Sequence, residues 1–166
     1  MSSKPHHRAI PKEVEIQKDP LKWVLRPRAL NIAWGNDSRN WEMPKAGEKD
    51  PAKLWMVSWF EVTGTIKDTN IVKGKSFEIS FKVDMEEAFE WTDLPVFMMA
   101  KLGKQGKCKW EKVPLSDGQE EAPVINMLIQ VEDDNHEHTL YFGLYEIWSA
   151  KCKVGMKIHH VEVTSK

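Results

Sequence analysis

Two tryptophans, Trp34 and Trp41, lie on either side of a short polar segment. An indole ring can stack on the apolar C–H face of a pyranose, while side-chain amides, carboxylates and hydroxyls bond to the sugar hydroxyls. The segment supplies such groups, and its Gly-Asn-Asp-Ser run predicts a turn. The segment is therefore a candidate carbohydrate-binding site made of Trp34, Trp41, Asn36, Asp37, Ser38 and Arg39. The pattern alone favours the competing interpretation, which places both tryptophans in the core, because tryptophan is usually largely buried.

The sequence carries no recognisable catalytic or metal-binding motif. A nucleophile elbow, a phosphate-binding loop and a dinucleotide fingerprint are all absent from it. The acidic stretch 86–93 could offer two carboxylates, but glycoside hydrolysis needs a defined separation between them. Residues 132–138 combine acids with two histidines, yet they lack zinc-site and EF-hand spacing, so a solvated hairpin tip is the better interpretation. We expect a protein that is not an enzyme and that uses no metal or cofactor.

A second candidate for chemistry is a group of lysines around Trp110. Its members are Lys101, Lys104, Lys107, Lys109 and Lys112. Lysines interleaved with an aromatic ring can bind single-stranded RNA through phosphate contacts and base stacking. Lysines also protect the edge of a sheet from aggregation, and the net charge of −1 favours this interpretation. A transport factor that binds RNA or protein through this cluster therefore remains the alternative function.

The elements that position these residues are short strands. Residues 77–85 alternate apolar and polar side chains over their whole length, which is typical of a strand with one buried face. Val14 and Ile16 predict a short edge strand, and a shift of apolar parity predicts a β-bulge at His159 and His160. The other strands are predicted at 30–34, 53–66, 96–102, 108–113, 124–131, 139–148 and 156–163. Such a series without helical crossovers predicts an all-β antiparallel sandwich of jelly-roll type.

Length and composition indicate one domain. The chain has 166 residues, eight of them Trp and only two Tyr, which suits a packed sandwich or an aromatic binding face. We expect a flexible N-terminal arm over residues 1–22 and a single domain over 23–166. No apolar run is long enough for a membrane span, and the N-terminus lacks a secretory h-region, so we expect a cytoplasmic protein. Cys108 and Cys152 permit one disulfide, but two free thiols are the default.

Several segments together resemble the phloem protein 2 (Nictaba-like) family of plant lectins. In that family a short strand ends in Trp-Gly-Asx and a second Trp follows seven residues after the first, as Trp34 and Trp41 do here. Residues 57–66 are close to the Cys-Trp-Phe-Glu-Ile-x-Gly-Lys-Ile core strand of the family. Weaker similarity occurs at 81–83, 89–95 and 155–158, so the resemblance covers residues 23–163.

The resemblance implies a lectin without catalytic activity that binds N-acetylglucosamine oligomers, namely chitooligosaccharides and the chitobiose core of N-glycans. It implies a jelly-roll sandwich, a homodimer, a location in phloem sap or cytoplasm and a role in plant defence. The sugar-binding tryptophans of the family correspond to Trp34 and Trp41, whereas Trp59 is expected in the core. One departure is residues 155–161, where the family has Gly-Trp-Met-Glu-Ile-Glu-Leu and this chain has Gly-Met-Lys-Ile-His-His-Val. The arm is also too short for the F-box domain of some relatives.

Overall fold

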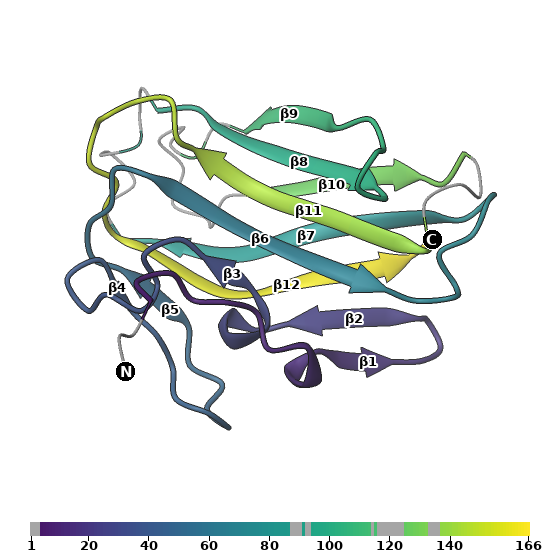
Figure 1. Cartoon of the computed structure of the whole chain (residues 1–166), viewed down its shortest axis with the longest axis horizontal. Helices are drawn as coiled ribbons and strands as arrows, with labels where there is room; N and C mark the ends of the chain where they lie inside the picture. The colour runs from purple at the N-terminus through teal and green to yellow at the C-terminus, as the bar shows by residue number, and fades with distance from the viewer. Residues whose placement is uncertain (1–3, 87–90, 92–93, 114, 116–124, 133–136) are drawn as a thin grey trace.

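The computed structural model describes residues 4–86, 91, 94–113, 115, 125–132 and 137–166. In this part of the chain two antiparallel sheets face each other (Figure 1). The predicted all-β sandwich is therefore confirmed. From β6 to β8 and again from β10 to β12, successive strands alternate between the two sheets, which is the crossing pattern of a jelly roll.

The larger sheet contains seven of the described strands. Its central strand is β12 (Met156–Ser165), which pairs along its length with β7 (Ser76–Met85). On its other side β12 pairs with two shorter strands, β2 (Lys22–Leu25) and β5 (Ala52–Leu54). The sheet is completed at its edges by β1 (Glu15–Gln17), β4 (Trp41–Glu42) and β10 (Ile125–Gln130).

The smaller sheet has five described strands in the order β3-β6-β11-β8-β9. Its bounds are β3 (Asn31–Ile32), β6 (Phe60–Lys67), β8 (Val96–Leu102), β9 (Lys109–Val113) and β11 (Thr139–Glu146). Two short 3-10 helices, η1 (Pro11–Glu13) and η2 (Pro27–Ala29), precede β1 and β3. No helix in the described ranges is long and apolar enough to cross a bilayer.

The core lies between the two sheets, because alternate side chains of each strand point inward. Phe81 of β7 and Phe142 of β11 meet across the sandwich with ring centroids 6.1 Å apart. The bulge predicted at His159 and His160 is confirmed, since the register of β12 against β7 shifts between Ile158 and His160. This shift keeps both ends of β12 facing the core.

Residues 53–66, predicted as one long strand, belong to two strands in different sheets. β5 lies in the larger sheet and β6 in the smaller one, so residues 55–59 have to cross between the layers. A crossing segment has no neighbouring sheet to cover both of its faces. Consequently Trp55, Met56 and Trp59 are about half exposed, although the sequence pattern predicted one continuous strand through them.

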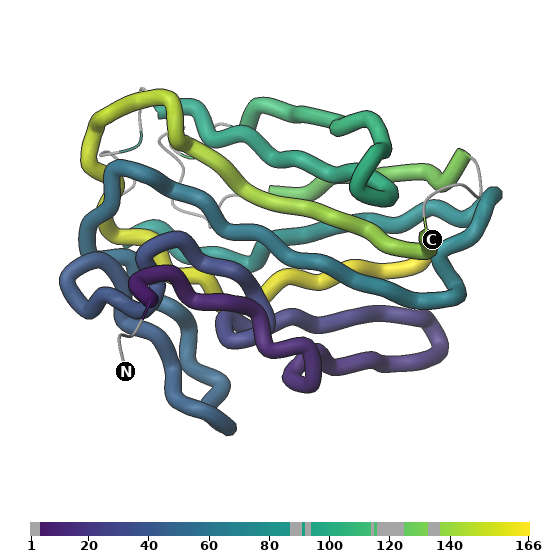
Figure 2. The backbone as a smooth tube through the Cα atoms, viewed as in Figure 1, coloured from purple at the N-terminus to yellow at the C-terminus, as the bar shows by residue number. Residues whose placement is uncertain are grey.

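The arm predicted as flexible over residues 1–22 makes defined backbone contacts in its described part, while its flexibility stays a prediction. Residues 4–10 lie against the smaller sheet, where His7 forms a β-bridge with Ile32 (Figure 2). His7 is buried, and its Nδ1 bonds to the carbonyl oxygen of Leu30 at 2.9 Å. The predicted edge strand around Ile16 is confirmed as β1, which pairs with β2. These backbone bonds hold the segment, and a count of apolar residues does not reveal them.

Gly64 of β6 provides a test of the close packing between the sheets. A Cβ built at this position would overlap the ring of Phe142, with Cε2 only 2.7 Å away. We expect Gly64→Ala to lower the free energy of unfolding by about 1–3 kcal/mol, because the core has no room for a methyl group. Urea denaturation measures this change. Thr65→Ala, on the outward face of the same strand, is the control and should change stability by no more than about 0.5 kcal/mol; equal effects of both variants would contradict the packing argument.

Candidate functional site

Trp34 follows β3 and lies in a strained backbone conformation. Its φ is +64°, a left-handed value that bulky residues rarely adopt. Its N–H donates to Nδ1 of His6 at 2.9 Å, and the two rings meet edge-on with centroids 4.9 Å apart. These contacts hold the backbone in place and leave 37% of Trp34 exposed. Strain that the surroundings maintain is frequent at binding sites, because it fixes the direction of a functional side chain.

Asn36, in the turn that follows, has a structural role. Its side-chain amide donates to the carbonyl oxygens of Lys4 and His6, both at 3.1 Å. Its backbone N–H donates to the carbonyl oxygen of Pro5 at 2.9 Å. Asn36 therefore fastens residues 4–6 to the turn, and through His6 it supports the orientation of Trp34.

Asp37 and Arg39 form a two-bond ion pair at the surface. One Asp37 oxygen accepts from Nε of Arg39 at 3.0 Å, and the other accepts from Nη2 at 2.7 Å. The hydrogen bond from the Arg39 side chain, with a further bond from its backbone N–H, lowers the pKa of Asp37 to about 2. Asp37 therefore stays ionised at neutral pH and presents a hydrogen-bond acceptor, while the exposed guanidinium of Arg39 presents donors.

Trp41 does not offer a ring face, which corrects the prediction for this residue. It begins β4, is only 2% exposed, and packs against Phe60 with ring centroids 6.1 Å apart. Its Nε1 is buried as well. The competing core interpretation thus describes Trp41, because pairing of β4 with β5 places the indole under the sheet edge.

Trp59 takes the place beside Trp34 that the sequence pattern assigned to Trp41. It was expected in the core, yet 47% of it is exposed, because it ends the segment that crosses between the sheets. Its Nε1 donates to Oε1 of Glu61 at 3.3 Å. No feature of the sequence predicted this exposure, because residues 53–66 continue as one strand-like pattern through Trp59.

Trp34 and Trp59 together line two adjoining hollows, which we call the Trp34–Trp59 groove. The first hollow, of about 470 Å³, is also lined by Asp37, Arg39, Asn40, Met56, Val57 and Ser58. The second, of about 390 Å³, is lined also by residues of the N-terminal segment, by Asn31 and by Glu61. The groove thus combines two indoles with an ionised carboxylate, a guanidinium and amide groups. This is the chemistry that a sugar ring requires.

The remaining predicted residues lie on the other side of the turn. Asn36, Ser38 and the edge of Trp41 line a separate hollow of about 420 Å³, whose exposed aromatic residue is Trp55. The structure therefore divides the six predicted residues. It brings Trp34, Asp37 and Arg39 together in the groove, and it separates the other three from them.

A buried ion pair supports the segment that carries Trp59. Lys153 Nζ is fully buried and lies 3.1 Å from Oε1 of Glu146. The same Nζ donates to the carbonyl oxygens of Ser58 and, at 2.9 Å, Ser149. Val57 and Lys153 also form a β-bridge. The last turn before Trp59 is therefore held by a charged group in the interior, which makes its position well defined.

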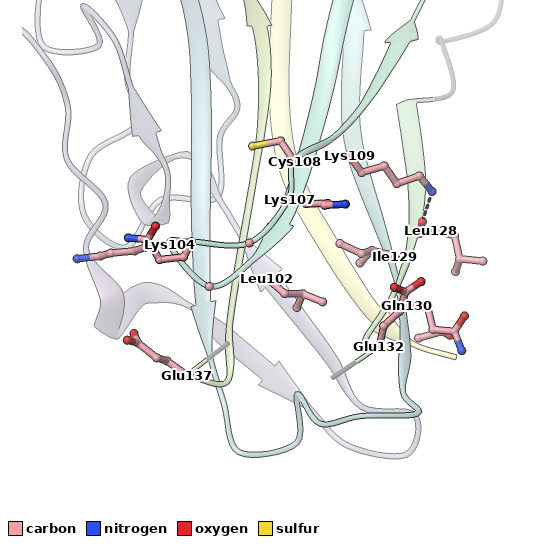
Figure 3. Close-up of a pocket in the computed structure, with 14 residues that line it drawn as sticks. Leu102, Lys104, Lys107, Cys108, Lys109, Leu128, Ile129, Gln130, Glu132 and Glu137 are labelled. Carbon is pink, nitrogen blue, oxygen red and sulfur yellow. Dashed lines mark hydrogen bonds between the residues drawn. The ribbon is translucent and has the colours of Figure 1, made fainter. Parts of the chain in front are cut away.

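Three lysines of the cluster, Lys104, Lys107 and Lys109, line a hollow of about 1130 Å³ at the other end of the sandwich (Figure 3). Their charges are partly engaged within the protein: Lys109 donates to the carbonyl oxygen of Leu128 at 2.6 Å and lies 3.5 Å from Glu111. Figure 3 also shows Lys104 extending to the opposite side of the hollow from Lys109, with Glu132 and Glu137 nearby. This mixture of signs is unlike the continuous positive surface of a nucleic-acid site.

Within the described ranges no group of three or more potential ligands could hold a metal ion. The acidic and histidine residues at 133–136, and most of the acidic stretch 86–93, lie outside those ranges. Cys108 and Cys152 are both free and exposed, in agreement with the default expectation of two thiols.

Comparisons with known proteins agree on one family. The model of the family described as Phloem protein 2 matches residues 21–165. Protein PHLOEM PROTEIN 2-LIKE A9 of Arabidopsis thaliana is 36% identical over 95% of this chain and 94% of its own length. Protein PHLOEM PROTEIN 2-LIKE A1 of the same plant is 27% identical, over 87% of this chain and 61% of its own length.

Solved structures give only a distant likeness. One described as "CBM4 structure and function" has a TM-score of 0.45 at 11% identity and covers 97% of this chain and 94% of its own. A TmCBM61 complex with β-1,4-galactotriose has a TM-score of 0.42 at 12% identity, covering 87% and 88%. Likeness at this level carries no argument about the site.

The ion pair with Arg39 predicts that the Asp37 carboxyl group titrates at an unusually low pH. Because the pKa of Asp37 is about 2 in the folded protein, against an ordinary value of 3.8, its contribution to stability is present above pH 3.8 and is lost as the pH falls through about 2. In Arg39→Gln we expect the Asp37 midpoint to return toward 3.8. Carboxyl-carbon NMR titration of both proteins measures this, and an unchanged midpoint in the variant would show that Arg39 is not the cause.

The Lys153–Glu146 pair predicts a strong loss of stability when one partner is removed. Lys153→Met should cost about 3–5 kcal/mol, because it leaves Glu146 buried without its counter-charge. The double variant Lys153→Met, Glu146→Gln should regain part of this, since the amide oxygen can still accept from Ser149. Guanidinium denaturation gives both values. Lys157→Met, which breaks an exposed pair with Glu86, is the control and should cost no more than about 1 kcal/mol.

Proposed function

Because this chain belongs to the phloem protein 2 family, we propose that it is a lectin without catalytic activity that binds N-acetylglucosamine oligomers in the Trp34–Trp59 groove. The observation that carries the proposal is the pair of exposed indoles that line one groove together with Asp37 and Arg39. The ligands would be chitooligosaccharides and the chitobiose core of N-glycans.

The groove offers complementary contacts to such a ligand. The apolar face of a pyranose would stack on Trp59 or Trp34, since these rings are large and lose little rotamer freedom on binding. The ionised Asp37 would accept hydrogen bonds from sugar hydroxyls, and Arg39 would donate to hydroxyl or acetamide oxygens. Neither step transfers a proton or forms a covalent bond, so the same groups suffice for binding alone.

The groove loses little conformational entropy when a ligand binds, because its aromatic residues are already held in place. The backbone of Trp34 is held by His6, and the turn before Trp59 is held by Lys153. Aromatic side chains fixed in this way bind more tightly than mobile ones, because less conformational entropy is lost on association. A homodimer would add a second groove and raise the affinity for ligands with two sites. Phloem sap or cytoplasm is the proposed location, supported by the names of the relatives.

Titration calorimetry with chitotriose tests the proposal. We expect the wild-type protein to bind, and we expect Trp59→Ala to weaken binding at least about tenfold through loss of the stacking face. Trp34→Gly should do the same, and glycine also tolerates the positive φ at this position. Circular dichroism and thermal unfolding show whether each variant is folded.

Trp55→Ala is the matched control. Trp55 is 51% exposed but lines the hollow on the other side of the turn, so its removal should leave affinity within about twofold. If Trp55→Ala abolishes binding and Trp59→Ala does not, the sugar lies beside Ser38 and Trp41 instead. If the folded wild type ignores chitotriose, the proposal fails. RNA binding that falls steeply with salt would then support the lysine cluster as the functional site.

A further inference from the structure

A second group of aromatic residues, two of them exposed and two half-buried, lies at the far side of the smaller sheet from the Trp34–Trp59 groove. We call it the outer aromatic cluster; its members are Phe97 of β8, Trp110 of β9, Tyr145 of β11 and Trp148, which follows β11. Trp110 is 47% exposed and Trp148 60%. Large apolar groups that remain exposed beside one another mark a binding surface more often than isolated ones do.

The rings of the cluster contact one another at defined angles. Trp148 meets Phe97 edge-on at 5.1 Å between centroids and Trp110 at 6.2 Å. Trp110 also meets Tyr145 at 5.4 Å. Beside these rings lies a hollow of about 660 Å³, with Leu94, Pro95, Ser149 and Lys151 in its lining. Because these rings pack edge-to-face, they are not coplanar. The cluster therefore borders a concave hollow and does not form a flat patch.

The outer aromatic cluster is joined to the Trp34–Trp59 groove by one row of outward side chains. In the sheet register Glu61 of β6 lies opposite Tyr145, Tyr145 opposite Phe97, and Phe97 opposite Lys112 of β9. Trp59 begins this row through its bond to Glu61. Figure 1 shows β6, β11, β8 and β9 side by side. Three steps between strands correspond to about 14 Å.

The side chain of Tyr145, in the middle of the row, projects little above the sheet, so that an elongated ligand has room to lie along the row. Tyr145 stands beside Gly143, and a Cβ added to Gly143 would lie 2.6 Å from the Tyr145 ring. The ring therefore lies along the sheet, over the space that a side chain would fill. Burial, followed by the nearby charge of Glu61, raises the pKa of Tyr145 to about 12, so its hydroxyl keeps its proton at neutral pH.

One buried ion pair holds the connections that carry both Trp59 and Trp148. Oε1 of Glu146 accepts from the backbone N–H of Ser149 at 2.9 Å, which holds the turn that carries Trp148. Its partner Lys153 bonds to the carbonyl oxygens of Ser149 and Ser58, and Ser58 precedes Trp59. Trp59 and Trp148 are consequently set at a fixed separation before any ligand binds.

We propose that the outer aromatic cluster is a distal subsite for the oligosaccharide chain bound in the Trp34–Trp59 groove, so that longer chains gain contacts across the smaller sheet. This inference rests on the proposed function. An oligosaccharide fits this surface because the ring of Trp59 and the rings of the outer aromatic cluster lie on either side of the hydrogen-bonding group Glu61. The core of a protein–protein interface is instead depleted of charged residues.

Calorimetric titration with a short and a long ligand tests the inference. Chitobiose is shorter than the row, whereas chitohexaose exceeds it. We expect the wild type to bind chitohexaose more tightly than chitobiose. Trp148→Ala should weaken chitohexaose binding about two- to tenfold and leave chitobiose binding unchanged, because only the long chain reaches Trp148. Trp59→Ala should weaken both, and Leu128→Ala, an exposed residue on β10 of the other sheet, should weaken neither.

A measurement on the unaltered chain makes the test independent of variant folding. In a two-dimensional NMR spectrum, the indole N–H signal of Trp148 should shift with chitohexaose and not with chitobiose, whereas that of Trp59 should shift with both. Equal responses of Trp148 to both ligands, or none to either while Trp59 responds, would overturn the distal subsite and leave the proposed function intact.

Two further outcomes distinguish failure of the proposed function from failure of the distal subsite alone. If the wild type binds neither oligosaccharide, the proposed function fails and the distal subsite fails with it. Sedimentation velocity addresses the other occupant of an aromatic surface, a second copy of this chain. A wild-type dimer that becomes a monomer in Trp148→Ala would assign the outer aromatic cluster to self-association, which would overturn the inference.

Discussion

The buried ion pair between Lys153 and Glu146 is the interaction on which the exposed aromatic surface of the smaller sheet depends. Removing two charges from water is costly, and the cost is offset only when each charge has close partners. Lys153 has three such oxygens, from Glu146, Ser58 and Ser149. Two of them belong to the connections that carry Trp59 and Trp148. Removal of either charge would therefore disturb the segments that carry Trp59 and Trp148 together. The sheets themselves are held by backbone hydrogen bonds and apolar packing.

A second constraint acts from the N-terminal segment. Trp34 occupies a left-handed backbone conformation that would not persist on its own, and His6, with Asn36 behind it, maintains this conformation. The segment is itself anchored by the buried ring of His7 against Leu30. Residues at the beginning of the chain thus become part of the Trp34–Trp59 groove. Their role is positional, because they fix an indole that contacts the ligand in the proposed function.

The two constraints meet on the outward face of the smaller sheet. That face has exposed indoles at both ends and hydrogen-bonding side chains between them, and it is fixed by groups that lie outside the sheet's own strands. The outer strands of the larger sheet carry no comparable arrangement in the described ranges: there Ile16 and Leu128 are exposed singly. The larger sheet therefore contributes mainly to the core, whereas the smaller sheet also presents the exposed aromatic residues on its outward face.

The sequence by itself determined the all-β architecture, the edge strand around Ile16, the bulge in β12 and the polar turn after Trp34. Each of these depends on local side-chain alternation or on turn residues, which a single chain displays directly. Family resemblance added the importance of Trp34. The sequence could not determine which tryptophan would stand beside it, because exposure depends on where the chain changes sheets. Pairing of β4 with β5 buried Trp41, and the crossing from β5 to β6 exposed Trp59. Only the tertiary structure decided this exchange, since Trp41 follows a polar segment and is nevertheless buried, whereas Trp59 lies in a largely apolar stretch and is nevertheless exposed.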